Sequence, residues 1–294
     1  MGDKINFSVD HFFYIGHSHL TGGKPCQDYA TSGMAGTTAY AIVSDGCSTG
    51  GNTDVGSRLV ALSVASVIKK ICARVENNHL LEDIKIRQRA VLAGAKEILG
   101  LSEEDLYATC VHACLSENGG YVSVLGDGVV VFAYRSGEME IIQYDWTDNM
   151  PYYPAYKEEG EMAFITSHGG DMNGLRVKEE RFVCDKNGIW TAGKIREISL
   201  REGMEGIILP LSKEIIDEIS FVALFSDGVT QVEKTEIISA VRRCTSYKNI
   251  RGAFAKRRMI NAIKEMQKEG CCPMDDIACA VISLEREEVC HDNN

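Results

Sequence analysis

Apolar residues recur along this chain at two spacings, one typical of strands and the other of helices. Alternating or short continuous apolar runs predict buried strands, and they occupy 6–16, 39–43, 108–116, 121–124, 128–134, 139–144, 221–227 and 277–284. Apolar residues three and four apart predict helices with one buried face, and they occupy 56–78, 80–99, 234–245 and 251–269. The two kinds of segment come in blocks rather than in strict alternation.

The order of these blocks indicates the fold class. It is strands, two helices, several strands joined by hairpin turns, two helices and a final strand. Sheets flanked by helix pairs favour an α+β fold, a four-layer αββα sandwich of two antiparallel sheets with helices on the outer faces. A doubly wound α/β sheet would need strands and helices to alternate throughout, so we disfavour it.

The composition is that of one globular domain spanning residues 1–294, with 45% apolar and 25% charged residues and no linker-like segment. Residues 145–213 are less regular and hold three of the five prolines, Pro151, Pro154 and Pro210. We interpret this region as a few strands, including pieces at 162–166, 181–183 and 188–191, with a mobile insertion near the functional site.

Acidic residues stand where several predicted strands end. Asp45-Gly46, Asp127-Gly128 and Asp227-Gly228 each follow a strand, and Asp275-Asp276 immediately precedes the last one. A single Asp-Gly pair indicates no more than a turn. Its repetition changes the interpretation, because strands that end side by side bring their carboxylates together. Hard divalent cations prefer oxygen ligands of this kind.

Charge and cysteine content exclude several classes of protein. The net charge of −11 and the pI near 5.2 argue against a nucleic-acid surface, which would need a basic face. No apolar run is long enough for a membrane span and no secretory signal is apparent, so we expect a cytoplasmic protein. The eleven cysteines are scattered, as expected of reduced core residues rather than disulfides.

A polar segment, HSHLTGGKPCQD, lies between the first strand and the Asp45 strand. It carries His17, His19, Lys24, Gln27 and Asp28 around a Gly-Gly pair. It is either a solvated surface loop or a loop that flanks the Asp45 site, since consecutive short strands are often neighbours.

The motifs in their order resemble those of the metal-dependent protein phosphatases of the 2C type, and most closely the bacterial branch with a KPCQD-like first motif. The resemblance covers about residues 16–284 and rests on QD, SDG, GDG, SDG and DD, with Thr109 ahead of the GDG. It implies the same αββα fold and hydrolysis of phosphoserine or phosphothreonine in a phosphorylated protein.

The resemblance also implies metal ligands at matching positions. Asp45 would bridge two Mg²⁺ or Mn²⁺ ions, Gly46 would contribute its backbone carbonyl, and Asp227 and Asp275 would complete the protein ligands. Asp127 would face a third, weaker metal position. A water activated between the two ions would attack the phosphorus directly, with no phosphoenzyme.

Other positions are expected to support these ligands. Asp28 would contact metal-bound water and act in catalysis, Thr109 would lie near the site, and Asp276 would support its neighbour Asp275.

Two positions depart from the family pattern. Gln27 stands where the family usually has a glutamate, and Gly23 stands where it has a phosphate-binding arginine. We therefore assign phosphate binding and a catalytic role to Lys24, with His17 and His19 as alternative phosphate ligands.

These departures leave other functions open. A catalytically inactive phosphatase-like domain that binds phosphoproteins or regulates a partner is the main alternative, and an unrelated metallohydrolase is another. Retention of Asp45, Asp227 and Asp275 favours the enzyme, because a binding module has no chemical need for three carboxylates at strand ends. The sequence makes no prediction of oligomeric state.

Overall fold

The computed structural model describes residues 5–72, 80–157 and 160–286. Within this part of the chain the strands form two sheets in which every neighbouring pair is antiparallel. In spatial order, the larger sheet holds β1 (Ile5–Tyr14), β12 (Ile277–Arg286), β11 (Ile219–Phe225), β6 (Gly128–Tyr134), β7 (Met139–Trp146), β8 (Leu175–Cys184) and β9 (Trp190–Ser199). The smaller sheet holds β10 (Ile207–Leu211), β5 (Gly119–Leu125), β4 (Cys110–Ser116), β3 (Thr38–Ser44) and β2 (Tyr29–Ala35).

Helices accompany both sheets. The longer ones are α2 (Thr53–Cys72), α3 (Leu80–Leu99), α7 (Ile237–Thr245) and α8 (Phe254–Lys268). The shorter ones are α1 (His17–Gly22), α4 (Glu161–Ser167), α5 (Leu200–Glu205), α6 (Lys213–Glu218) and the 3₁₀ turns η1 (Glu104–Leu106), η2 (Thr147–Asn149), η3 (Pro154–Lys157) and η4 (Asp227–Thr230). Among the described helices, none combines the length and apolar character that crossing a membrane requires.

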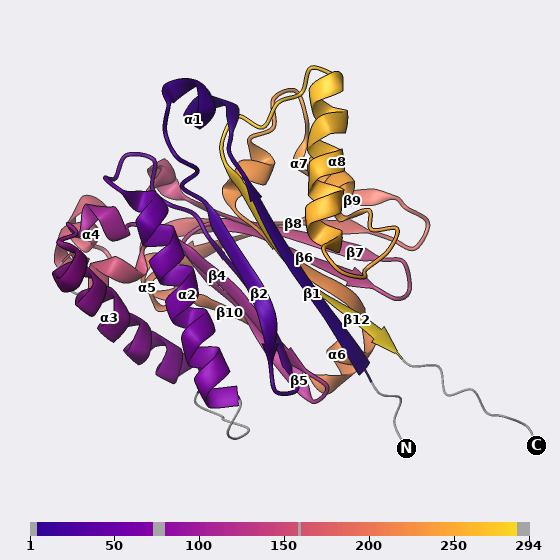
Figure 1. Ribbon diagram of the computed structural model, residues 1–294, viewed down its shortest axis with the longest axis horizontal. Coiled ribbons are helices and arrows are strands. Elements are labelled where there is room, and N and C mark those ends of the chain that lie inside the picture. Colours follow the sequence, from indigo (N-terminus) through magenta and orange to yellow (C-terminus); the bar gives the residue numbers. More distant parts are fainter. Residues whose placement is uncertain (1–4, 73–79, 158–159, 287–294) are drawn as a thin grey trace, which may run out of the picture.

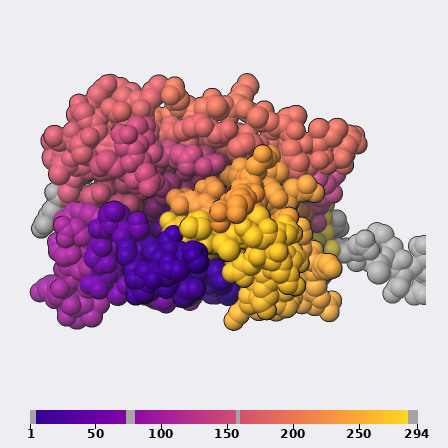
Figure 2. All heavy atoms as spheres, turned by 90° about the horizontal axis from the view of Figure 1, so that it is seen from above, coloured from indigo at the N-terminus to yellow at the C-terminus, as the bar shows by residue number. Residues whose placement is uncertain are grey.

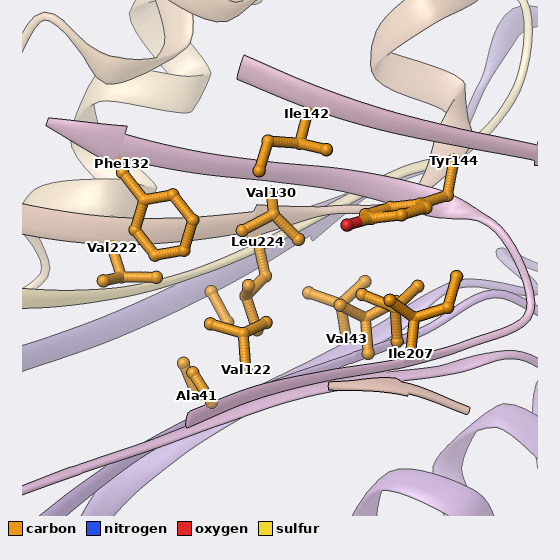
Figure 3. Packing of buried hydrophobic residues seen from close by; sticks show 14 of the residues in the cluster. Ala41, Val43, Val122, Val130, Phe132, Ile142, Tyr144, Ile207, Val222 and Leu224 are labelled. Atoms are coloured by element: carbon orange, nitrogen blue, oxygen red, sulfur yellow. The ribbon is translucent and has the colours of Figure 1, made fainter. Parts of the chain in front are cut away.

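The central core lies between the two sheets. Alternate residues of β3, such as Ala41 and Val43, point across to Val130, Ile142 and Leu224 of the larger sheet (Figure 3). These side chains are almost completely buried. Period-two alternation in the sequence therefore places one face of each sheet in a shared apolar layer.

The opposite faces of the sheets are covered by helices. Tyr40 and Ile42 of β3 pack with Val60 and Val64 of α2, and α3 contributes to the same layer. The outer face of the larger sheet packs against α7 and α8, for example at Met259. The predicted αββα sandwich is therefore confirmed, with the helix pairs on its two outer sides (Figure 1).

Several predicted segments differ from the structure. Residues 162–166 form a helix, α4, rather than a strand, because one helical turn buries Phe164 beside Trp146 while Met162 remains 71% exposed. The polar segment after β1 contains the short helix α1. The helix predicted from 234 begins at Ile237, since Lys234 has a φ of 56°. Residues 73–78 of another predicted helix lie outside the described residues.

The irregular region 145–213 contributes to both sheets. Its strands β8 and β9 extend the larger sheet beyond β7, and β10 forms an edge of the smaller sheet beside β5. The predicted strand pieces at 181–183 and 188–191 fall on or next to this β8–β9 hairpin.

A buried histidine on β4 gives a prediction about acid stability. His112 is 4% exposed, its Nε2 has no hydrogen-bond partner among the described residues, and burial lowers its pKa to about 4 from 6.5. Its contribution to stability is therefore full above pH 6.5 and is lost as the pH falls towards 4, because the unfolded chain then binds the proton. We expect this histidine alone to lower the free energy of unfolding by about 3 kcal/mol between pH 6.5 and pH 4.

Urea unfolding of wild type and His112→Leu at pH 7 and pH 4.5 measures this effect. The loss of unfolding free energy on acidification should be clearly smaller in the variant. Equal losses in the two proteins would contradict the assignment.

Candidate metal centre

Four strand ends converge at one end of the sandwich. Asp45 follows β3, Asp127 lies in the turn that joins β5 to β6, Asp227 opens η4 directly after β11, and Asp275 precedes β12. The pairing of Phe225 with both Val129 and Cys279 sets three of these ends side by side. Segments from both ends of the chain gather on this face (Figure 2).

The glycines after the aspartates allow this convergence. A Cβ on Gly46 would lie 2.7 Å from the carbonyl oxygens of Gln27 and Thr53, and one on Gly228 would lie 1.8 Å from the carbonyl oxygen of Asp276. Each glycine therefore packs against the backbone of another segment that carries a site residue. The Asp-Gly pairs are close-approach positions as well as turns.

The carboxylates of this site repel one another. Burial raises the pKa of Asp45 well above its ordinary value, and the charges of Asp28, Asp227 and Asp127 raise it further. Burial and neighbouring carboxylates also raise the pKa values of Asp28, Asp127 and Asp227. Asp275 is among the charges that act on Asp227, and Asp276 is among those that act on Asp28, so the structure brings all six predicted acidic residues together.

These residues fit a hard divalent cation. Oδ2 of Asp28 and Oε1 of Gln27 are buried and have no hydrogen-bond partner among the described residues. Buried carboxylates and unpaired oxygen acceptors cost free energy unless a cation or an ordered water satisfies them. Asp45, Asp227 and Asp275 could hold such ions through oxygen atoms alone, as Mg²⁺ and Mn²⁺ prefer.

One further carboxylate belongs to this neighbourhood and was missed from the sequence. Asp145 raises the pKa values of Asp127 and Asp227, and it accepts hydrogen bonds of 2.9 Å from Nε2 of Gln143. The apolar pattern predicts a strand that ends at Tyr144, whereas β7 continues to Trp146 by pairing with β8. The pairing places Asp145 on a strand end next to the site.

Asp276 joins the segment before β2 to the start of β12. Its carboxylate accepts hydrogen bonds from the backbone N–H of Gly16 (2.7 Å) and Gln27 (2.6 Å), and from Nδ1 of His19 (2.8 Å). Ligand atoms of His19, Asp275 and Asp276 all lie within 4.8 Å of one another. Because these hydrogen bonds already occupy Asp276, we interpret it as the residue that positions its neighbours.

The predicted phosphate ligands are dispersed. His19 is buried and engaged with Asp276, which does not favour its predicted role in phosphate binding. His17 is exposed on α1. Lys24 is exposed and its Nζ donates a 3.1 Å hydrogen bond to the carbonyl oxygen of Ser48, in the loop that follows Asp45.

Thr109 supports the backbone of Asp45. Its N–H donates to the carbonyl oxygen of Asp45 (2.8 Å), and its Oγ1 accepts from the N–H of Asp45 (3.1 Å). The Ser44 hydroxyl also donates to the carbonyl oxygen of Thr109 (2.6 Å). This expected neighbour of the site therefore fixes the end of β3.

The glycine-rich loop after Asp45 is closed by two side chains. Nε2 of Gln27 donates to Oγ1 of Thr53 (2.6 Å), and this hydroxyl donates to the carbonyl oxygen of Cys47 (3.0 Å). Asp105, which the sequence gave no reason to select, accepts from the N–H (2.5 Å) and Nδ2 (2.9 Å) of Asn52 and faces Gly51. The loop glycines therefore allow close packing against η1.

Comparisons with known proteins identify the family of this chain. The family model described as Protein phosphatase 2C matches residues 15–257. The chain therefore belongs to the protein phosphatase 2C family, as the order of motifs predicted. A comparison with curated protein sequences finds no match.

Solved structures show the same fold. A bacterial serine phosphatase superposes with a TM-score of 0.56 at 14% identity, covering 97% of this chain and 100% of that one. Serine/threonine phosphatase Stp1 from Staphylococcus aureus gives 0.53 at 13% identity, covering 97% and 96%. The Mycobacterium tuberculosis serine/threonine phosphatase PstP/Ppp gives 0.52 at 17% identity, covering 95% and 99%.

Proposed function

We propose that this protein hydrolyses phosphoserine and phosphothreonine in protein substrates at a site that holds two Mg²⁺ or Mn²⁺ ions. The observation that carries the proposal is the group of buried and half-buried, mutually repelling carboxylates around Asp45, with the unpaired Oδ2 of the buried Asp28 among them. A group of this kind is costly in a folded protein unless it binds cations. Membership of a phosphatase family supports the choice of reaction.

In this proposal each residue has a defined task. Asp45, Asp227 and Asp275, with the carbonyl of Gly46, hold two ions, and Asp127 faces a third, weaker position. When bound, such ions lower the pKa of a water and neutralise charge on the phosphoryl oxygens. Oδ2 of Asp28 is the free acceptor that orients this water. Thr109 keeps Asp45 in place through the backbone hydrogen bonds described above.

The main alternative is an inactive domain that binds phosphoproteins. Gln27 motivates it, because an amide replaces the carboxylate that the family usually has there. Its Nε2 is used in the hydrogen bond to Thr53, so Oε1, which is buried and has no partner among the described residues, is its remaining acceptor. A neutral acceptor can still orient a water, and this favours the enzyme.

Metal dependence tests the proposal. Hydrolysis of para-nitrophenyl phosphate and of a phosphothreonine peptide should appear on addition of Mn²⁺ or Mg²⁺ and disappear with EDTA. Binding of the phosphopeptide without turnover under all metal conditions would favour the inactive domain. Turnover that persists in EDTA would contradict the metal site.

Lys24 is our candidate for phosphate binding within the proposed function. A single ammonium holds phosphate as a point charge, so its loss should act mainly on substrate affinity. We expect Lys24→Ala to raise the KM for the phosphopeptide about 3–10-fold, with Mn²⁺ affinity unchanged. An unchanged KM, together with a raised KM in His17→Ala, would move this role to His17.

A further inference from the structure

Tyr153 extends from the irregular region 145–213 to the loop after Asp45. It lies between η2 and η3, yet its side chain is buried, with only 6% of the residue exposed. Its ring stacks on that of Tyr107 with centroids 5.5 Å apart and an interplanar angle of 18°, and it also contacts the ring of Tyr156 at 5.4 Å. This packing fixes the direction of the Tyr153 side chain.

Both tyrosines of this stacked pair, Tyr153 and Tyr107, contact Cys47. The Tyr153 hydroxyl lies next to the Cys47 thiol, and this thiol also hydrogen-bonds to Oγ1 of Thr49 (3.2 Å). The carbonyl oxygen of Tyr107 accepts a 2.9 Å hydrogen bond from the backbone N–H of Cys47. The Cys47 side chain is thus confined between Tyr153 and Thr49, and its backbone is held by Tyr107, on which Tyr153 stacks.

The loop fixed at Cys47 is the one that holds Lys24. Ser48 follows Cys47, and its carbonyl oxygen accepts the hydrogen bond from Nζ of Lys24 (3.1 Å). An ammonium on a flexible stem has little directional preference of its own. A fixed carbonyl that takes one of its N–H groups gives it a defined position and leaves the other two donors free.

We propose that Tyr153 is a positioning residue that places the ammonium of Lys24 through Cys47 and the Ser48 carbonyl. Region 145–213 thereby contributes to phosphate recognition without contacting the substrate. The proposal rests on the proposed function where it assigns phosphate binding to Lys24. The link from Tyr153 to Lys24 can be tested without turnover.

The first experiment uses Tyr153→Phe, which removes the hydroxyl and keeps the stacked ring. We expect the KM for a phosphothreonine peptide to rise about 3–10-fold, with kcat and Mn²⁺ affinity nearly unchanged. Tyr152→Phe is the matched control: it removes a hydroxyl from the same aromatic cluster, and the charges that act on that hydroxyl are those of Glu161 and Arg89. This control should leave KM unchanged.

A double-mutant cycle shows whether Tyr153 acts through Lys24. If it does, Tyr153→Phe should have no further effect on KM in a Lys24→Ala background, because the group that it positions is gone. Additive effects of the two substitutions would overturn the proposal.

A second measurement is independent of catalysis. Release of Lys24 from Ser48 in Tyr153→Phe should increase its rate of acetylation by acetic anhydride about 2–5-fold relative to exposed Lys186, as quantified by mass spectrometry. An unchanged ratio would overturn the link even if KM rises. If no variant hydrolyses phosphopeptide, the proposed function fails, and the acetylation ratio alone decides whether Tyr153 positions Lys24.

Discussion

Asp227→Asn should abolish most metal-dependent hydrolysis and, at the same time, stabilise the metal-free protein. The substitution removes a charged ligand from an ion that tolerates little distortion, and we expect kcat/KM to fall at least ~100-fold with weaker Mn²⁺ binding. In the metal-free protein it also removes one of the charges that raise the pKa of Asp45. Calorimetric Mn²⁺ titration and thermal unfolding with and without Mn²⁺ measure both effects.

The gain in metal-free stability should depend on pH. Because Asp45 and Asp227 have raised pKa values in the folded state, the cost of their repulsion is absent below about pH 4 and grows as the pH rises. At pH 8 the melting temperature of the metal-free variant should therefore exceed that of wild type, by about 2–4 °C for each kcal/mol of repulsion removed. At pH 4 the two melting temperatures should be equal. The amide can still accept the hydrogen bond from Gln231, so folding should be retained.

Asp217→Asn is a suitable control for this experiment. Asp217 pairs with Arg286 (3.1 Å) at the end of β12, about 30 Å from the Asp275 end of the same strand. Asp217→Asn changes the net charge by the same amount as Asp227→Asn, but it should alter neither Mn²⁺ affinity nor turnover. If both variants behave alike, Asp227 is not a ligand.

The fold and the acidic residues of the site were predictable because the information is local. Alternation in β3, β6 and β11 marks the strands, and an Asp-Gly pair directly after a strand needs no knowledge of distant contacts. The αββα order of blocks then places these strand ends together. Asp45, Asp127 and Asp227 follow from this local pattern, and the structure brings them to one end of the sandwich.

Residues that support the site were harder to predict because their partners are far away in the chain. His19 resembles a free base in a polar segment, and only its contact with Asp276, 257 residues later, shows otherwise. Asp105 stands in an ordinary acidic stretch, and Tyr153 in the least regular part of the chain. Their roles depend on tertiary packing, which no periodicity within a short window reports.

Gly228→Ala should be the most destabilising small substitution near the site. Its Cβ would lie 1.8 Å from the carbonyl oxygen of Asp276, and a backbone atom at the start of β12 cannot rotate away as a side chain would. We expect a loss of about 3 kcal/mol in unfolding free energy. The forced shift would also separate Asp227 from Asp275, so Mn²⁺ affinity should fall in the fraction that remains folded.

Gly94→Ala is a control in which alanine should stabilise the protein rather than destabilise it. Urea unfolding measures the free energy of unfolding of both variants. Gly94 lies inside α3, and a Cβ there would meet nothing within 4 Å, so alanine should stabilise the protein by about 0.5–1 kcal/mol through its higher helix propensity. A Gly228→Ala protein as stable as wild type, with normal Mn²⁺ binding, would mean that η4 and β12 can separate without cost. The Asp-Gly glycines would then be turn residues only, and the convergence of the four strand ends would need another explanation.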